Sequence, residues 1–188
     1  FARLAGFREE EIEGDGRAFW GYVTHGGTEG NMYGLYLARE LFPEGVVYFS
    51  EDTHYSVSKI LRLQHTRNIM IRSQPDGEMD YADLEESLRI HRDTPPIFFL
   101  NAGTTMTGAV DRVDRVLDMA RRLCLPHHYI HVDAALSGMI LPFVENPPPW
   151  NFAAGIDSLS ISGHKMLGSP LPCGVALARK NHVDRVAR

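Results

Sequence analysis

Ile97-Phe98-Phe99-Leu100-Asn101 is the stretch that decides the fold. An apolar run of this length, closed by one amide, is typical of a strand that is buried on both faces of a parallel sheet. Residues 111–124 follow with the clearest helical periodicity of the chain, on a stripe made of Val113, Val116, Leu117, Ala120, Leu123 and Cys124. Residues 129–133 then form a second strand-like run. A strand, a helix and a strand in this order predict a βαβ unit.

Strands and helices alternate on both sides of this unit. Further strands are expected at residues 20–24, 46–49, 68–72, 158–162 and 174–178. Further helices are expected over 1–16, closed by Gly14-Asp15-Gly16, over 28–42 with Met32, Leu35 and Tyr36 on one stripe, over 54–65, and after the turn at 75–77 with an apolar face of Tyr81, Leu84 and Leu88. The alternation predicts one α/β domain over residues 1–188, with three α/β/α layers and a mainly parallel sheet.

Composition bounds the environment and the partners of the chain. Its 188 residues are 44% hydrophobic and 23% charged, which are ordinary values for a globular domain. A net charge of −5 with scattered basic residues gives no sign of nucleic-acid binding, and no apolar run reaches the length of a membrane span. Cys124 and Cys173 are expected as free thiols in a reducing compartment, so we expect a cytoplasmic protein. Because the chain starts at Phe1 and stops within the charged run 180–188, we interpret it as a fragment of a longer enzyme.

One lysine stands in an unusual setting, Ser160-Ile161-Ser162-Gly163-His164-Lys165-Met166-Leu167-Gly168-Ser169-Pro170. Most lysines are solvated surface residues, and that interpretation stays open for Lys165 on this stretch alone. A desolvated lysine is a nucleophile toward carbonyl groups and forms Schiff bases, with pyridoxal phosphate among others. This second interpretation requires that the other parts of a pyridoxal site lie upstream.

Polar residues follow several expected strands, at the place where open α/β sheets bind ligands. Gly26-Gly27-Thr28 follows the first strand and opens a helix. Its N–H groups and the helix dipole can hold a phosphate, although a simple helix entry fits the pattern as well. Asp133 ends a strand just before Ala134 and Ala135. Opposite a pyridine nitrogen, its carboxylate would stabilise the protonated ring; a helix N-cap is the alternative.

Further candidates lie at other strand ends. His54 stands at the start of an expected helix, where its ring could stack on a flat cofactor or simply cap the helix. Asn101-Ala102-Gly103-Thr104-Thr105 offers hydroxyl groups to a ligand. His127, His128 and His131 suggest a metal site. Strand alternation places His128 and His131 on opposite faces, so we expect no metal there.

Taken together, five motifs resemble the group II pyridoxal-phosphate-dependent amino-acid decarboxylases of fold type I, and within them the histidine decarboxylases of Gram-negative bacteria. The motifs are Gly21-Tyr22-Val23-Thr24-x-Gly-Gly-Thr28-Glu29-Gly30-Asn31, Asp52-Thr53-His54-Tyr55-Ser56-Val57, Gly103-Thr104-Thr105, His131-Val132-Asp133-Ala134-Ala135-Leu136-Ser137-Gly138 and Ser162-Gly163-His164-Lys165-Met166. They occur in the family's order from Trp20 onward. Serine decarboxylases resemble the same segments, so the motifs are more specific to the decarboxylase group than to one substrate.

The resemblance implies the cofactor, pyridoxal 5′-phosphate, and a catalytic set. Lys165 would be the lysine that forms the Schiff base, and Asp133 would be the partner of the pyridine nitrogen. His54 would stack on the cofactor ring and lie near the substrate carboxylate. Each of the three sits at the position that matches the family's motif.

The resemblance also implies how the rest of the cofactor is held. The phosphate would be bound by Gly27, Thr28, Ser162 and His164. Thr105 would lie near the ring. His25 departs from the family's pattern, in which an asparagine is expected at this position. The position is next to the loop that would bind the phosphate.

As a whole, the resemblance implies decarboxylation of L-histidine to histamine and CO₂. A serine or aromatic amino-acid decarboxylase, another fold type I enzyme such as an aminotransferase or a β-eliminating enzyme, and a non-catalytic interaction domain are the alternatives. Residues 1–188 would be a partial large domain that binds the cofactor, lacking an N-terminal segment, a C-terminal small domain and a mobile loop. The full-length form would be a homodimer or a homotetramer.

Overall fold

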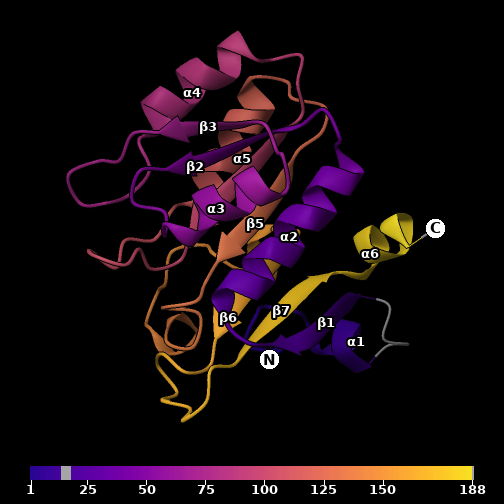
Figure 1. Ribbon diagram of the computed structural model, residues 1–188, viewed down its shortest axis with the longest axis vertical. Coiled ribbons are helices and arrows are strands. Elements are labelled where there is room, and N and C mark those ends of the chain that lie inside the picture. Colours follow the sequence, from indigo (N-terminus) through magenta and orange to yellow (C-terminus); the bar gives the residue numbers. More distant parts are fainter. Residues whose placement is uncertain (14–17, 188) are drawn as a thin grey trace.

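The strands of the computed structural model, which describes residues 1–13 and 18–187, form one seven-stranded sheet in the order β1-β7-β6-β5-β4-β2-β3 (Figure 1). They are β1 (Phe19–Thr24), β2 (Val46–Ser50), β3 (Asn68–Ile71), β4 (Pro96–Asn101), β5 (Tyr129–Asp133), β6 (Ser158–Ser162) and β7 (Gly174–Arg179). β7 runs antiparallel to β1 and β6, whereas the other neighbouring pairs are parallel. The prediction of a mainly parallel sheet is therefore confirmed.

Helices cover both faces of this sheet, which confirms the three-layer α/β/α prediction (Figure 1). They are α1 (Glu9–Glu13), α2 (Gly27–Leu41), α3 (Ser56–Leu63), α4 (Tyr81–Ile90), α5 (Val113–Arg122) and α6 (Lys180–Val186), and two short 3₁₀ turns span Leu141–Phe143 and Phe152–Ala154. α2 and α3 pack on one face, and α4 and α5 on the other. Among the described helices, none is both long enough and apolar enough to span a bilayer.

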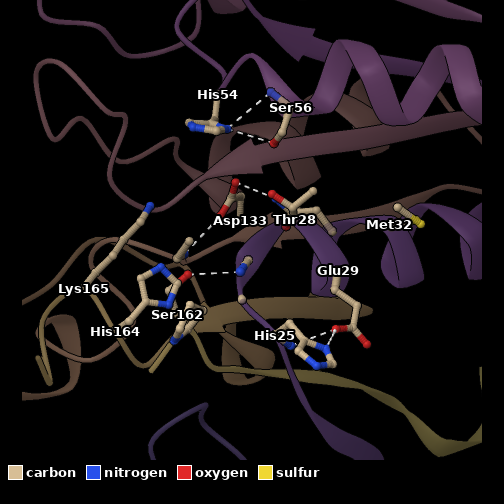
Figure 2. A pocket seen from close by; sticks show the side chains of 15 residues that line it. His25, Thr28, Glu29, Met32, His54, Ser56, Asp133, Ser162, His164 and Lys165 are labelled. Atoms are coloured by element: carbon tan, nitrogen blue, oxygen red, sulfur yellow. Dashed lines mark hydrogen bonds and ion pairs between the residues drawn. The ribbon is translucent and has the colours of Figure 1, made fainter. Parts of the chain in front are cut away.

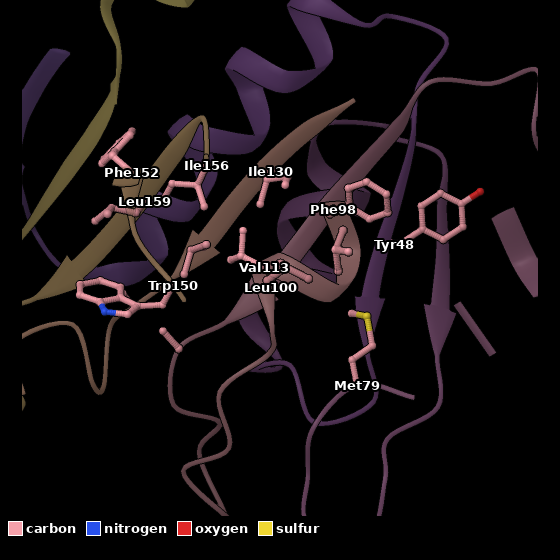
Figure 3. Close-up of a cluster of buried hydrophobic side chains, with 14 of the residues drawn as sticks. Tyr48, Met79, Phe98, Leu100, Val113, Ile130, Trp150, Phe152, Ile156 and Leu159 are labelled. Atoms are coloured by element: carbon pink, nitrogen blue, oxygen red, sulfur yellow. The ribbon is translucent and has the colours of Figure 1, made fainter. Parts of the chain in front are cut away.

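β4 is the centre of both cores because its side chains alternate between the two faces. Phe98 and Leu100 enter the cluster that packs against α4 and α5, which Figure 3 shows from close by. Ile97 and Phe99 enter the cluster beneath α2 and α3. All four side chains are fully buried. Each such burial stabilises the fold by about 1.5–3 kcal/mol, so this single strand ties the two layers together.

The N-terminal helix is shorter than the sequence predicts. Of residues 1–13, only Glu9–Glu13 is helical, whereas a helix over residues 1–16 was expected. The expected closure at Gly14-Asp15-Gly16 lies outside the described residues. The preceding segment is held by packing instead: the ring of Phe7 stacks on Phe152 with centroids 4.1 Å apart. Burying this aromatic contact against the core overrides the weak helical pattern.

The stripe expected on α5 is correct except at its C-terminal end. Val113, Val116 and Ala120 are buried as predicted, but Met119 completes the face and Cys124 is exposed. The helix ends at Arg122, and Cys124 has a positive φ of 53°. This left-handed residue turns the chain away before the stripe can continue.

The stripe expected on α2 is correct at Leu35, which is 1% exposed, and Met32 packs partly buried against the same core. Tyr36 is the exception, and glycines form the part of the helix that lies closest to the sheet. Tyr36 is 38% exposed, although the periodicity places it on the buried face. A Cβ atom at Gly30 would lie 2.5 Å from Ser160 Cβ, and one at Gly34 would lie 2.1 Å from His131 Nδ1. Real Cβ atoms do not approach so closely, so both positions require glycine. The glycines let the helix lie directly on β5 and β6.

We expect Gly34→Ala to lower the free energy of unfolding by about 1–3 kcal/mol, because the added methyl group overpacks against His131. Helix propensity alone would favour alanine by about 1 kcal/mol, so the sign of the effect tests the close approach. Urea unfolding of the full-length protein measures it. Glu40→Ala, at an exposed position of the same helix, is the control and should change stability by less than about 0.5 kcal/mol. A Gly34→Ala variant as stable as the wild type would contradict this packing.

Candidate active site

The carboxyl ends of β1, β2, β5 and β6 meet at one edge of the sheet, because these strands run in the same direction. A cavity of about 480 Å³ opens at this edge. It is lined by His25, Gly26, Gly27, Thr28, Glu29, Asn31, Met32, His54, Ser56, Asp133, Ala135, Ser162, His164, Lys165 and Pro172 (Figure 2). Seven of the eight residues expected from the sequence to hold the cofactor are in this set; Thr105 is the exception.

The N-terminus of α2 forms one wall of the cavity. The first N–H groups of a helix have no partner within it and carry a partial positive charge. The N–H group of Gly27 donates to Ser162 Oγ at 3.1 Å, which joins the helix to the end of β6. A Cβ atom at Gly27 would lie 2.8 Å from Ala135 Cβ, so only glycine leaves this approach open. The arrangement suits an anion such as a phosphate.

Asp133 lies at the base of the cavity and is only 8% exposed. Its Oδ1 accepts from the N–H group of Ala135 at 3.0 Å, and its Oδ2 accepts from Asn31 Nδ2 at 2.7 Å. Burial raises the pKa of Asp133, while these two donors and the nearby side chains of Lys165 and His54 act to lower it. No ion pair to this carboxylate forms within residues 1–13 and 18–187. A buried carboxylate in this position calls for a cationic N–H group from a ligand.

Behind Asp133 lies a fully buried histidine. His131 Nδ1 is 2.7 Å from Ser158 Oγ, and His131 Nε2 is 3.0 Å from Asn31 Oδ1. Burial lowers the pKa of His131 to about 3, so the ring is neutral. Its Nε2 must carry the proton because the amide oxygen only accepts, and Nδ1 therefore accepts from the hydroxyl group of Ser158. In the part of the chain that the structure describes, no three His, Cys, Asp or Glu side chains gather as metal ligands do.

His54 is held beside the cavity by the loop between β2 and α3. Its Nδ1 lies 2.8 Å from Ser56 Oγ and accepts from the N–H group of Ser56 at 3.3 Å. The preceding residue is fixed to the sheet, because Thr53 Oγ1 accepts from the N–H group of Ser50 at 3.1 Å and from Asn101 Nδ2 at 3.1 Å. Ser56 thus sets the orientation of the ring.

Lys165 lies on the loop after β6, with its side chain exposed and extending toward the side of the cavity where His54 and Asp133 lie (Figure 2). Its amine makes neither a hydrogen bond nor an ion pair with any described residue, whereas Lys59 lies over the ring of Tyr55 and Lys180 pairs with Asp184. Of the three lysines of the chain, Lys165 is the one that lines the cavity.

His164 lies next to Lys165 and is fixed from the opposite strand. Its Nδ1 is 3.0 Å from the carbonyl oxygen of Cys173 and 3.3 Å from the N–H nitrogen of the same residue. A Cβ atom at Gly26 would lie 3.1 Å from His164 Cε1, so the His164 ring packs against the residue that precedes α2. His164 thereby brings the loop after β6 against the N-terminus of α2.

Thr105 is exposed and lies outside the cavity. The chain reverses at Gly103, whose φ is +102°, and Thr104 and Thr107 bond to each other through their hydroxyl groups at 2.7 Å. This closed turn carries Thr105 at its tip. Its expected place near the ring stays a prediction.

Asn31 is the main residue of the cavity to which the sequence assigned no role. It belongs to the motif after β1, but nothing in the spacing shows that its side chain points at Asp133. Its neighbours Gly27 and Gly34, which sit four and three residues away on the same face, were the available signal. His25, by contrast, has a 97% exposed side chain and pairs with Glu29 at 3.0 Å at the mouth of the cavity.

Comparison with known proteins agrees with this geometry. Residues 36–184 match the model of the pyridoxal-dependent decarboxylase conserved domain. The chain belongs to the pyridoxal-dependent decarboxylase family. It is 56% identical over 170 residues to histidine decarboxylase of Klebsiella aerogenes, which covers 89% of this chain and 45% of that protein. It is 53% identical over 165 residues to histidine decarboxylase of Raoultella ornithinolytica, covering 87% and 72% respectively.

A solved structure shares the fold. L-methionine decarboxylase from Streptomyces sp.590, as the Q64A mutant, superposes with a TM-score of 0.84 at 23% sequence identity, over 96% of this chain and 55% of that one. The chain thus spans about half the length of that protein and less than half the length of the Klebsiella relative. At this level of identity, the structural likeness bears on the fold alone.

The cavity fits the family's cofactor, pyridoxal 5′-phosphate. The fit rests on three observations: a buried carboxylate without an ion-pair partner among the described residues, a helix N-terminus that only glycine leaves accessible, and a lysine with a free amine. Pyridinium nitrogen, phosphate and aldehyde are the three groups that such residues bind.

The buried His131 gives a test by pH. Its pKa of about 3 in the folded protein lies below the value of 6.5 in the unfolded chain. As the pH falls, the unfolded chain therefore takes up a proton first, and stability is lost below about pH 6.5. Between pH 7 and pH 5, we expect the wild type to lose about 2 kcal/mol more than His131→Gln does.

Urea unfolding at the two pH values measures this difference. His127→Gln replaces an exposed histidine and is the control for the substitution of histidine by glutamine as such. The same dependence on pH in the wild type and in His131→Gln would show that His131 is not a buried neutral ring.

Proposed function

We propose that the full-length protein is a pyridoxal-phosphate-dependent amino-acid decarboxylase that converts L-histidine to histamine and CO₂. One observation carries this proposal: the free amine of Lys165, the buried carboxylate of Asp133 and the open N-terminus of α2 line the same cavity. The family supports the reaction class. The histidine decarboxylases of several bacteria, at 51–56% identity, support the substrate.

When bound, the cofactor supplies an electron sink for the pair left as the bond between Cα and the carboxylate breaks. In the proposed arrangement, Lys165 carries the cofactor on its Nζ atom. Asp133 would hold the proton on the pyridine nitrogen, because attraction between the pyridinium and the buried carboxylate offsets the cost of removing both charges from water. The ring of His54 would stack on the cofactor ring and lie near the α-carboxylate of the substrate.

The phosphate is assigned to the opposite end of the cavity. The N–H group of Thr28 would donate to it at the start of α2, with the helix dipole adding to the attraction. Gly27, whose own N–H group donates to Ser162 Oγ, would let the phosphate approach because it has no side chain. Ser162 and His164 would complete the site from the end of β6. In this arrangement the phosphate and the ring nitrogen are held by different elements, which fixes the cofactor at two points.

We further propose that residues 1–188 form the large, cofactor-binding domain of a longer cytoplasmic protein that assembles as a homodimer or homotetramer. Large apolar side chains beside the site residues support an interface there: Tyr55 is 68% exposed next to His54, and Met166 and Leu167 are 48% and 58% exposed next to Lys165. Isolated domains seldom leave such a group exposed, so a second subunit is the proposed cover.

Trapping the cofactor on its lysine tests the assignment of Lys165. We expect borohydride reduction of the full-length protein with pyridoxal phosphate to place a pyridoxyl group on the peptide that contains Lys165. Peptide mass mapping distinguishes this peptide from those of the other two lysines. An adduct on Lys59 or Lys180 would overturn the assignment, and Lys165→Arg is the control that should abolish trapping.

The substrate is tested separately from the reaction. We expect kcat/KM of the full-length enzyme to be higher for histidine than for serine by about a hundredfold or more, because a site that binds a ring nitrogen discriminates strongly against a substrate without one. Release of ¹⁴CO₂ from carboxyl-labelled amino acids measures both. A preference for serine would leave decarboxylation standing and overturn histidine as the substrate.

A further inference from the structure

We propose that Asn31 is a positioning residue that keeps the Asp133 carboxylate ionised and turned toward the cavity, as the end of a buried chain of hydrogen bonds that starts at Ser158. This inference rests on the proposed role of Asp133 as the partner of the pyridine nitrogen. Asn31 is 2% exposed and sits on α2, not on the strand that carries Asp133.

The direction of each hydrogen bond in the chain follows from chemistry. Ser158 donates to His131 Nδ1, and His131 Nε2 donates to Asn31 Oδ1, since the ring is neutral and the amide oxygen only accepts. Ser160 Oγ donates to the same oxygen at 2.5 Å. Asn31 Nδ2 then donates to Asp133 Oδ2 at 2.7 Å. Every proton points toward the carboxylate.

A chain of aligned donors polarises its last member. Because Asn31 Oδ1 accepts two hydrogen bonds, its NH₂ group becomes a stronger donor to Asp133. This lowers the pKa of Asp133 against the effect of burial, which raises it. The lone pairs that Asn31 and Ala135 do not use are left to face the cavity.

An amide is the group that the position requires. Its oxygen must accept from His131 and Ser160, while its nitrogen must donate to Asp133, and an amide does both without binding or losing a proton. An aspartate has the same shape but no donor. At residue 31 it would set two carboxylates against each other, and the shared proton would neutralise Asp133.

A merely structural role for Asn31 predicts a different outcome, because α2 also carries the anion site at its N-terminus. If Asn31 only held the helix in place, its replacement would weaken binding at the phosphate and at the ring alike. If it acts through Asp133, the loss should depend on the ring nitrogen. Two probes separate these cases: pyridoxine 5′-phosphate, and its 1-deaza analogue, which has C–H in place of the ring nitrogen. Neither carries an aldehyde, so Lys165 forms no covalent bond to them.

The experiment measures the dissociation constants of both probes for the full-length protein by calorimetry. The wild type should prefer the pyridine over the deaza analogue. We expect Asn31→Asp to weaken binding of pyridoxine 5′-phosphate by about tenfold or more and to leave that of the deaza analogue within about twofold, so the preference disappears. Asn68→Asp, the same exchange at an exposed asparagine, should keep the preference.

Equal losses for both probes, or a preference retained in Asn31→Asp, would overturn the proposal. Should Asn31→Asp fail to fold, Asn31→Ala removes the donor without adding a charge and must show the same loss of preference. A wild type that binds both probes equally would remove Asp133 as the partner of the ring nitrogen, and with it the basis for Asn31. Failure of the role of Asp133 is thus distinguished from failure of Asn31 alone.

Discussion

The close approach of α2 to β5 and β6 is the constraint on which the site depends. Gly30 and Gly34 meet the sheet where a Cβ atom would lie within 2.5 Å and 2.1 Å of its side chains. A helix held one side chain further away could not bring Asn31 to Asp133 at 2.7 Å. Nor could it set its N-terminus against Ser162. One packing distance therefore fixes both the expected phosphate end and the expected ring end of the cavity.

This arrangement is costly to build, because it places polar groups in the interior. His131, Asn31, Ser158 and Ser160 are all buried, together with the carboxylate of Asp133. Each unsatisfied group of this kind would destabilise the fold by about 1–3 kcal/mol. The hydrogen bonds between them satisfy the groups mutually, so the interior holds an oriented carboxylate without losing its stability. The apolar cores around β4 supply the compensating burial on either side.

The sequence predicts the sheet well because strand and helix patterns are local. Ile97-Phe98-Phe99-Leu100-Asn101 is recognisable as a buried strand from its own composition, and β4 has that character. Lys165, Asp133 and His54 could likewise be placed at strand ends, and they line one cavity. Their assigned roles came from motif resemblance rather than from spacing.

What the sequence did not predict depends on contacts between distant segments. Hydrophobic periodicity correctly places Leu35 on the buried face of α2, but it also places Tyr36 there, and Tyr36 is exposed. The close contact of α2 with the sheet depends on Gly30 meeting Ser160 and Gly34 meeting His131, which are distant along the chain. The sequence assigned no role to Asn31 for the same reason, because its contact with Asp133 joins two segments that are distant along the chain. Thr105 lies close in sequence to a strand end and is exposed after the turn at Gly103, so its expected place near the ring stays a prediction.

Two buried asparagine–aspartate pairs at this edge of the sheet show how the protein separates support from chemistry. Asp111, which is 1% exposed, accepts from the N–H group and the Nδ2 group of Asn101 and from the N–H group of Met79, all at 2.8–2.9 Å. Its oxygens are occupied from within the protein, and Asn101 Nδ2 also reaches Thr53, next to His54. Asp111 therefore anchors the loop that positions the ring of His54.

Asp133 accepts only two hydrogen bonds from the described residues, one on each oxygen, and borders the cavity. A carboxylate can accept about four hydrogen bonds, so capacity remains on the side that faces a ligand. The two aspartates therefore differ in how many hydrogen bonds they accept from the protein, three against two, and in that only Asp133 lines the cavity. The aspartate away from the cavity supports the site, and the one that retains accepting capacity at the cavity is the one that we propose acts on a bound ring.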